Sequence, residues 1–301
     1  ITCRDWSSDV CSSDLSFYMP LESLGGDYFD LKELDHNKIA IIMADCTGHG
    51  IEAALYSVIV KSLADRYYYL LEQGETDIFL GEINNATIDY FQGYNFFTMF
   101  VGILDTRTKT FIYSNANGET PFILGQRGIE KTPPAKGFYV GYNKDQFYEK
   151  VVIPIAAGDR LFFYSDALKE IRLHNSCLGS DGIKEILKSI PWEKYELSYI
   201  FDKIEIINQF FPYDDDLTAV MLEYKEPYRN VVEIEDETEA RNLRLNLETT
   251  LEGYNYSEFD TQSLVVVFDE ITSNGIIHGN KMEPGKKLKV EICVNYIFCS
   301  F

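Results

Sequence analysis

Four short acidic segments of this sequence contain residues that could bind divalent cations. They read GGDYFD, which contains Asp27; MADCTGHG, which contains Asp45; FYSDALKE, which contains Asp166; and YDDDLTAV, which contains Asp214–Asp216. Carboxylate oxygens are preferred ligands of hard cations such as Mg²⁺ and Mn²⁺. Two such ions ~3.5–4 Å apart would lower the pKa of a bound water and neutralise the charge of a phosphoryl group. If the segments meet in the fold, they predict a two-cation site for phosphoryl hydrolysis.

Each segment also has a structural interpretation. Asp27 could cap a turn, and Asp45 and Asp166 could each cap a following helix. The run from Asp214 to Asp216 could be a solvated loop. For any one segment alone we favour the structural interpretation, whereas the four in this order favour the metal site. Without bound cations, clustered aspartates would repel each other and their pKa values would rise.

Three other polar residues are further candidates for the site. His49 stands between Gly48 and Gly50, where it could protonate a leaving serine oxygen or bond to the backbone of a turn. Asn115 and Asn117, in SNANGE, could reach the site or shape a turn. We favour the turn for all three residues.

Hydrophobic patterning predicts the elements that would position the aspartates. A turn at 35–37 joins strands 27–34 and 38–44 into a hairpin, and the apolar run of its second strand ends at Asp45. Asp166 follows the apolar run LFFYS in the same way. The further expected strands are 97–104, 110–114, 122–124, 146–155, 160–164 and 217–223, and the helices are 51–69, 76–92, 182–189 and 194–210. Antiparallel strands flanked by helices predict a layered α+β sandwich.

Composition and charge limit the classes of partner. The chain has 301 residues, 46% of them hydrophobic, so about two domains with sizeable cores are expected. Its formal net charge of −21 argues against nucleic acid or an anionic membrane as a partner. No apolar run approaches the ~20 residues of a membrane span. The six cysteines are scattered without zinc-type pairing, which predicts a reducing, cytoplasmic location.

Residues 1–15, ITCRDWSSDVCSSDL, lack both a hydrophobic period and the basic start of a signal peptide. They resemble a translated sequencing adapter, and we expect an artefact or non-native segment. Residues 16–224 would then form a first domain, 225–230 a linker, and 231–301 a second domain. In the second domain we expect a strand at 231–235, helices at 237–253 and 261–278, and a strand at 287–298. Because this domain stops on its strand, we expect it to be partial.

The first domain resembles the SpoIIE/RsbU branch of the metal-dependent type 2C protein phosphatases. The resemblance spans nearly the whole domain and rests on FYMPLESLGGDYFD, ADCTGHGIEAAL, NFFTMFVGILD, SNANGETPFIL, GDRLFFYSDALKE and DDDLTAV. It implies a four-layer αββα sandwich and two Mn²⁺ or Mg²⁺ ions that hydrolyse phosphoserine or phosphothreonine. By this resemblance Asp45 bridges both metals and is catalytic together with Asp27. Asp166 and Asp215 complete the metal site, and Cys46 contributes its backbone carbonyl.

Ala167 departs from the family pattern, which has glycine after the aspartate of the YSD motif. If that position requires a positive φ, alanine would be strained and activity would be reduced. Asp215 is chosen from its run because it lies three residues before Thr218, as in the family pattern. Asp214 and Asp216 remain alternatives.

The second domain contains FDEITSNGIIHGN, in which Glu270, Asn274 and His278 lie at i, i+4 and i+8 on one helix face. This spacing alone favours an ordinary polar face. The stretch nevertheless resembles the N-box of the GHKL ATPases, in particular the RsbW-type anti-sigma-factor kinases. That resemblance implies that Asn274 holds Mg²⁺ and that Glu270 acts as a base or polarises a water. The glycine-rich lid motifs of that family do not follow, so we expect this copy to bind ATP weakly.

Together the resemblances imply a bacterial, cytoplasmic protein-serine/threonine phosphatase fused to a partial anti-sigma-like kinase domain. The implied substrate is a phosphorylated anti-sigma-factor antagonist in a partner-switching pathway, and a sigma factor is a further candidate partner. Two alternatives remain open: a non-catalytic module that sequesters a regulatory partner, and a kinase-dominated regulator with a vestigial phosphatase domain. Mn²⁺-dependent hydrolysis of a phosphoserine peptide tests the first alternative, and ATP binding tests the second.

Overall fold

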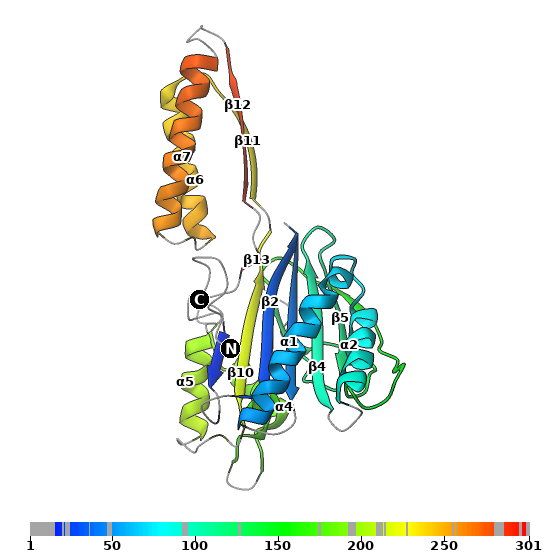
Figure 1. Cartoon of the computed structure of the whole chain (residues 1–301). Helices are drawn as coiled ribbons and strands as arrows, with labels where there is room; N and C mark the ends of the chain where they lie inside the picture. The colour runs from blue at the N-terminus through cyan, green and yellow to red at the C-terminus, as the bar shows by residue number, and fades with distance from the viewer. Residues whose placement is uncertain are drawn as a thin grey trace. The chain divides into compact units, whose positions relative to one another are not determined.

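The computed structural model describes residues 16–19, 21, 25–35, 37–46, 50–91, 96–125, 128–173, 176–191, 197–208, 213, 215–226, 228–254, 256, 258–279, 286–294 and 297–298. The segment expected to be non-native, residues 1–15, lies outside this set. The chain divides into two compact units: unit 1 comprises residues 1–225 and 297–301, and unit 2 comprises residues 226–296. Figure 1 shows the elements of each unit.

Unit 1 contains two antiparallel sheets. The strand order of the first is β2-β3-β4-β5-β8. Its strands are β2 (Asp27–Asp35), β3 (Lys38–Cys46), β4 (Phe97–Asp105), β5 (Thr110–Ala116) and β8 (Val151–Pro154). Two helices, α1 (Gly50–Glu72) and α2 (Thr76–Phe91), pack on one face of this sheet (Figure 1).

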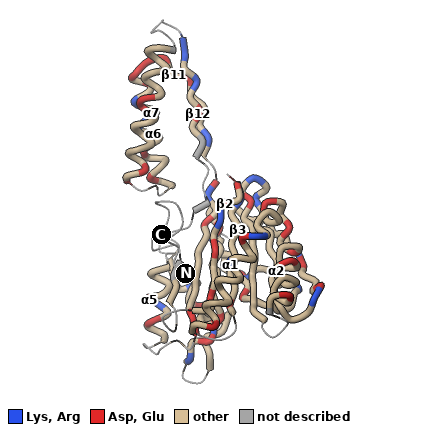
Figure 2. The backbone as a smooth tube through the Cα atoms, viewed as in Figure 1, with Lys and Arg blue, Asp and Glu red and all other residues tan. Residues whose placement is uncertain are grey.

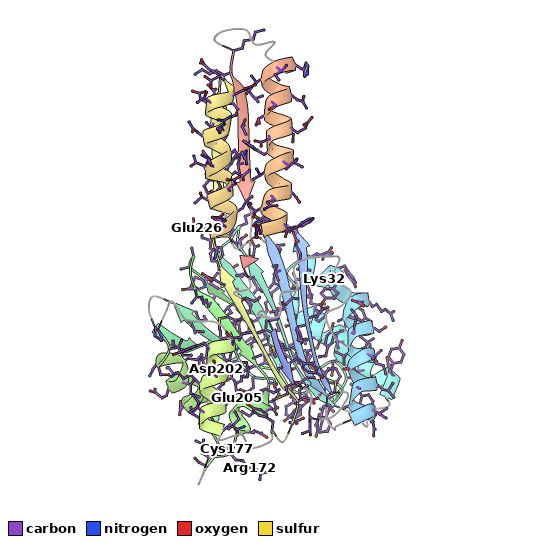
Figure 3. All side chains as sticks on the ribbon, turned by 90° about the vertical axis from the view of Figure 1, so that its left-hand side faces the viewer. Lys32, Arg172, Cys177, Asp202, Glu205 and Glu226 are labelled. Atoms are coloured by element: carbon purple, nitrogen blue, oxygen red, sulfur yellow. The ribbon has the colours of Figure 1, made fainter. Side chains whose placement is uncertain are left out.

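The second sheet has the strand order β1-β10-β9-β6-β7, and β13 pairs with β10 as well. Its strands are β1 (Ser16–Met19), β6 (Phe122–Gly125), β7 (Gly128–Lys131), β9 (Arg160–Tyr164), β10 (Leu217–Tyr224) and β13 (Ile297–Phe298). Its outer face is covered by α3 (Asp166–Glu170), α4 (Gly179–Lys188) and α5 (Leu197–Asn208). Between α3 and α4, Arg172 and Cys177 form an isolated antiparallel bridge (Figure 3).

The apolar runs of the central strands are buried on both faces. In β9, Phe162 packs against the helices α3–α5, whereas Leu161 and Phe163 pack against the other sheet. In β3, Ile42 joins the core beneath α1 and α2, whereas Ile41 joins the core between the sheets. Because successive side chains of a strand point to opposite faces, each sheet is covered on both sides. The layers therefore follow the order helices, sheet, sheet, helices, and unit 1 has a mixed α+β fold.

Most elements expected from the patterning are present with shifted ends. The helix expected at 51–69 is α1, which continues to Glu72, and the strand expected at 146–155 is restricted to β8. The strands β1 and β7 and the helix α3 were not expected from the pattern. Each spans only four or five residues, which is too short for a hydrophobic period to appear.

The described residues of unit 2 form two strands, two α-helices and a π-helical turn. The strands β11 (Tyr228–Ile234) and β12 (Leu288–Val294) pair antiparallel. The helices are α6 (Glu237–Gly253) and α7 (Glu258–Asn274), and a π-helical turn, η2 (Gly275–Gly279), continues α7. The Asp236 side chain caps α6 by accepting the backbone N–H groups of Thr238 and Glu239 at 2.8 and 2.9 Å. Apolar residues of α6, α7 and both strands form the core of this unit.

The prediction of a single strand at 287–298 is wrong. In the structure β12 ends at Val294, and Ile297–Phe298 forms β13, which pairs with Glu223 and Tyr224 of β10 in unit 1. An alternating pattern shows that residues are extended, but it does not show which sheet they join. The expected linker 225–230 is also shorter in the structure, because β11 begins at Tyr228.

Asp and Glu residues are distributed over the helices and strands of both units (Figure 2). None of the helices in the described ranges is long and apolar enough to cross a membrane.

Candidate active site

The hairpin β2–β3 places two aspartates directly opposite each other. Asp27, the first residue of β2, is the cross-strand partner of Asp45 near the end of β3. On its other side Asp45 is paired with Thr98 of β4. Like charges opposite each other destabilise a sheet, so this pair requires a compensating interaction.

The loop before β2 is held against the start of β10 by Asp216. The Asp216 carboxylate accepts the backbone N–H of Leu21 at 2.7 Å through Oδ1 and that of Gly26 at 2.5 Å through Oδ2. A Cβ atom at Gly25 would overlap this carboxylate, which explains why glycine is needed in the GGDYFD segment. Next to this anchor, the Thr218 hydroxyl donates to Asp27 Oδ2 at 2.6 Å.

Ser165 fixes the position of Asp166. Its backbone N–H donates to the Thr218 carbonyl at 2.8 Å, and its Oγ accepts the Thr218 N–H at 2.9 Å. The same hydroxyl donates to the Asp216 carbonyl at 3.1 Å. Asp166 follows as the first residue of α3, where a carboxylate interacts favourably with the helix dipole. The end of β9 is thereby tied to the start of β10, and Asp166 lies beside the hairpin aspartates.

A cavity of about 120 Å³ brings these residues together. Three of the predicted ligands, Asp27, Asp45 and Asp166, line it. The remaining described lining residues are Tyr28, Met43, Ala44, Thr98, Phe100, Asn117, Gly118, Glu119, Tyr139, Tyr164, Ser165, Lys169 and Thr218.

Burial and neighbouring carboxylates raise the pKa values of three of these aspartates. Burial, followed by the charges of Asp166 and Asp215, raises the pKa of Asp45 to about 7. Burial and the charge of Asp45 raise the pKa of Asp27 well above its usual range, although the Thr218 hydrogen bond opposes this. Burial and the charge of Asp166 also raise the pKa of Asp215. Four acidic groups from four separate segments therefore interact electrostatically at one place.

This donor set fits a pair of divalent cations by its chemistry. Buried carboxylates that repel each other are stabilised when a cation binds between them. Among the residues that the structure describes, however, no group of three or more His, Cys, Asp or Glu side chains is arranged closely enough to ligate one ion. The fit therefore rests on the carboxylates and on their mutual repulsion, not on ligand distances.

The structure changes the interpretation of several candidate residues. Asp45 lies within β3 and Asp166 lies within α3, so neither is the N-cap of a helix. Ala167 is the second residue of α3 and does not have a positive φ, so the strain considered for alanine does not arise. His49 and Asp214 lie outside the described residues.

Cys46 and the two asparagines have distinct surroundings. The Cys46 side chain is buried, and burial together with the charges of Asp45 and Asp27 raises the pKa of its thiol. In the absence of a metal ion this environment favours the protonated thiol. Asn115 exchanges two hydrogen bonds of 2.8 Å with Gly118, which confirms its expected role in a turn. Asn117 has φ +60° and lines the cavity.

Asp216 and its neighbour Asp215 differ in their contacts. Asp216 is 6% exposed and its oxygens accept backbone N–H groups, whereas Asp215 accepts only the adjacent Asp216 N–H at 2.8 Å among the hydrogen bonds of the described residues. The Asp216 carboxylate thus has a structural role. Of these two residues, Asp215 is the better candidate for a metal ligand.

We expect Asp216→Ala to lower the free energy of unfolding by about 2–3 kcal/mol, because it leaves the N–H groups of Leu21 and Gly26 without their acceptor. Urea unfolding of the full chain with EDTA present measures this change. Asp215→Ala is the matched control and should alter stability by less than about 1 kcal/mol. Equal losses in the two variants would contradict the assigned anchor role.

Sequence reasoning missed several residues of the cavity. Thr218 and Ser165 were not selected, because a hydroxyl in or beside a strand has no distinctive pattern. Glu119 and Lys169 were missed because they pair across 50 positions of sequence. The spacing of Lys169 three residues after Asp166 was the available signal, since it places both on one side of a helical turn.

In unit 2, Glu270 and Asn274 are adjacent on α7. The Asn274 side-chain amide donates to Glu270 Oε1 at 3.0 Å, and the pair is exposed. His278 lies in the π-helical turn that follows. Glu270 and Asn274 therefore contact each other, as expected for i, i+4 neighbours. The helix becomes π-helical at Gly275, so His278 does not continue the same helix face.

Sequence comparisons agree with this geometry. The family model described as Stage II sporulation protein E (SpoIIE) matches residues 35–225, which is 191 of 301 residues. The phosphoserine phosphatase RsbU of Bacillus subtilis is 26% identical over 211 residues, which cover 69% of this chain. The chain spans 62% of the length of RsbU.

Two solved structures share the fold. The RsbU and RsbW domains of Rv1364c from Mycobacterium tuberculosis match with a TM-score of 0.70 and 21% identity, covering 88% of this chain and 75% of that one. RsbX in complex with magnesium matches with a TM-score of 0.50 and 17% identity, covering 68% and 92%. Because the family match covers more than half of its length, the chain belongs to the Stage II sporulation protein E (SpoIIE) family.

Proposed function

We propose that unit 1 is a metal-dependent hydrolase of phosphoserine or phosphothreonine in proteins. The observation that carries this proposal is the pairing of Asp27 with Asp45 across the hairpin, in one cavity with Asp166. Burial and neighbouring carboxylates raise the pKa of Asp45 to about 7, so a bound cation would favour the ionised form of this group at neutral pH. Membership of the SpoIIE family supports the same reaction.

In this proposal Asp27, Asp45, Asp166 and Asp215, together with the Cys46 carbonyl, would hold two Mn²⁺ or Mg²⁺ ions. The cations would supply Lewis acidity that activates water and neutralises phosphoryl charge. The side chains of the protein hold the proposed metal ligands in position. Thr218 orients the Asp27 carboxylate through its hydrogen bond, and Ser165 holds the segment that carries Asp166.

The proposed substrate is a phosphorylated anti-sigma-factor antagonist in a cytosolic partner-switching pathway. Its support is the similarity to RsbU, which is named a phosphoserine phosphatase. A sigma factor remains a further candidate partner of the whole protein.

We further propose that unit 2 is related to RsbW-type ATPases. Unit 1 accounts for 230 of the 301 residues, about 76%, whereas the match to the RsbU and RsbW domains of Rv1364c covers 88%. Part of that match therefore falls in unit 2. The hydrogen bond between Asn274 and Glu270 supports this proposal, since a neighbouring carboxylate and amide are suited to hold Mg²⁺ beside a nucleotide. Calorimetric titration with ATP and Mg²⁺ tests this assignment.

The phosphatase proposal is tested by incubating the full chain with a phosphoserine peptide in Mn²⁺ or in EDTA. We expect phosphate release with Mn²⁺ and none above background with EDTA, because the carboxylates alone provide no activated water. A phosphotyrosine peptide of the same sequence serves as the specificity control. Absence of release in Mn²⁺, combined with intact folding, would favour a non-catalytic regulator; strong ATP binding in addition would favour the kinase-dominated one.

A further inference from the structure

The described residues that line the cavity carry several acidic groups and one basic group. The acidic residues are Asp27, Asp45, Glu119 and Asp166, and the basic residue is Lys169. A phosphoserine side chain has a charge of about −1.5 to −2 at neutral pH and three acceptor oxygens. Carboxylates repel such a group. A positively charged side chain inside the cavity would therefore strengthen its binding.

Lys169 is held in place by a three-membered ion network. Its Nζ donates to Glu119 Oε1 at 2.7 Å, and Lys131 Nζ donates to Glu119 Oε2 at 3.3 Å. Lys131 also donates to the Ser180 hydroxyl at 2.9 Å and lies 5.7 Å from the ring centroid of Tyr164. The side chains of Lys169 and Glu119 are only 34% and 17% exposed. Two ammonium groups therefore share one carboxylate, and the network has a net charge of +1.

The network also keeps its members ionised. Burial opposes the charge of Glu119, but the hydrogen bond and charge of Lys169 and the charge of Lys131 outweigh it and lower the pKa of that carboxyl. Burial likewise opposes the charge of Lys169, but its hydrogen bond to Glu119 raises the pKa of the ammonium. An ammonium group has three N–H donors, and Glu119 occupies one of them. Lys169 thus combines a positive charge with donor capacity toward the cavity.

The fold brings this ammonium next to the proposed metal ligands. Lys169 follows Asp166 by three residues in α3, so the two side chains lie on the same side of the helical turn. Glu119 comes from the segment between β5 and β6, next to Asn117 and Gly118, which also line the cavity. A lysine that served only to join these segments would not need to line the cavity together with three aspartates.

We propose that Lys169 binds the phosphoryl oxygens of the substrate in this cavity and that Glu119 is its positioning residue. This inference deepens the phosphatase assignment and rests on it. Lys169 contributes affinity for the phosphate dianion, and the metal ligands contribute the hydrolysis. The residue is thus expected to affect binding more than turnover.

The test compares Lys169→Met, Lys169→Arg and the wild-type full chain. Met retains most of the length of the side chain without its charge, so we expect KM for a phosphoserine peptide to rise about 10- to 100-fold while kcat changes less than about threefold. Arg keeps a cationic donor and should restore KM to within about fivefold of wild type. Glu119→Gln should raise KM about threefold to tenfold, since it keeps an acceptor but loses the charge that fixes Lys169.

Binding of inorganic phosphate gives a readout that does not depend on turnover. Calorimetry with Mg²⁺ present should show a dissociation constant weakened at least about tenfold in Lys169→Met and little changed in Lys169→Arg. The control is Lys188→Met on α4, which removes a lysine paired with Glu185 at the same distance of 2.7 Å but away from the cavity.

The possible outcomes separate this inference from the phosphatase assignment. Wild-type phosphate affinity in Lys169→Met, equal losses in the Met and Arg variants, or no phosphate binding by the wild type would each overturn the role of Lys169. Phosphate binding that depends on Lys169, without hydrolysis of the peptide by the wild type, would support the anion site and reject the hydrolase.

Discussion

Replacing Asp45 with asparagine is expected to reduce Mn²⁺-dependent hydrolysis of a phosphoserine peptide by at least about 10³-fold. Asparagine has nearly the same shape but no negative charge, so it holds divalent cations less tightly. The effect is large because Asp45 is paired with Asp27 on β2 and also interacts with the charges of Asp166 and Asp215. Initial rates over a range of Mn²⁺ concentrations measure the loss, and anomalous scattering at the manganese edge shows whether the ions are absent.

Misfolding is an alternative explanation that can be separated from loss of metal. Because Asp45→Asn removes one of two opposed, partly buried charges, the metal-free variant should be at least as stable as the metal-free wild type. The control is Asp202→Asn, which removes an exposed carboxylate from α5 (Figure 3) and should leave the rate unchanged within about twofold. If Asp45→Asn kept more than a tenth of the activity, the proposed role of Asp45 in holding the cations would be wrong.

The second large effect is a dependence of stability on pH that Mn²⁺ reverses. The pKa of Asp45 is about 7 in the folded chain, because of burial and the nearby carboxylates, against about 3.9 when unfolded. Between about pH 4 and pH 7 the folded metal-free chain therefore binds more protons than the unfolded chain, so its stability falls as the pH rises. For Asp45 alone the loss is on the order of 4 kcal/mol, and Asp27 shifts in the same direction.

Urea unfolding at pH 5 and pH 8, with EDTA or with Mn²⁺, measures this dependence. In EDTA we expect the chain to be less stable at pH 8 than at pH 5. Saturating Mn²⁺ should restore stability at pH 8 by at least about 2.7 kcal/mol when its concentration is 100 times its dissociation constant. Asp45→Asn should show a weaker pH dependence and a smaller gain from Mn²⁺, whereas Asp202→Asn should behave as wild type. A wild-type chain that became more stable with rising pH in EDTA would contradict the repulsion inferred at this site.

Local pattern was sufficient to predict much of the scaffold. The hairpin, the helices α1 and α2, and the strands around β9 and β10 have long periodic or apolar runs, and their side chains must be buried wherever the segment lies. The motifs around Asp27, Asp45 and Asp166 were also readable, because each aspartate lies next to a strand of this kind. The sequence therefore predicts well whether a segment is a helix or a strand, and which reactive side chains lie at its ends.

Only the tertiary structure decided which of these groups interact and what each one does. Asp215 and Asp216 are adjacent and chemically identical, yet only Asp216 meets the backbone N–H groups of the loop before β2. Ala167 could be judged only once its helical backbone was known. Likewise, Lys169 acquires its proposed role from Glu119 and Lys131, which come from other segments. The physical reason is that hydrogen bonds and charge interactions act over a few ångströms in space, and a folded chain sets those distances independently of separation along the sequence.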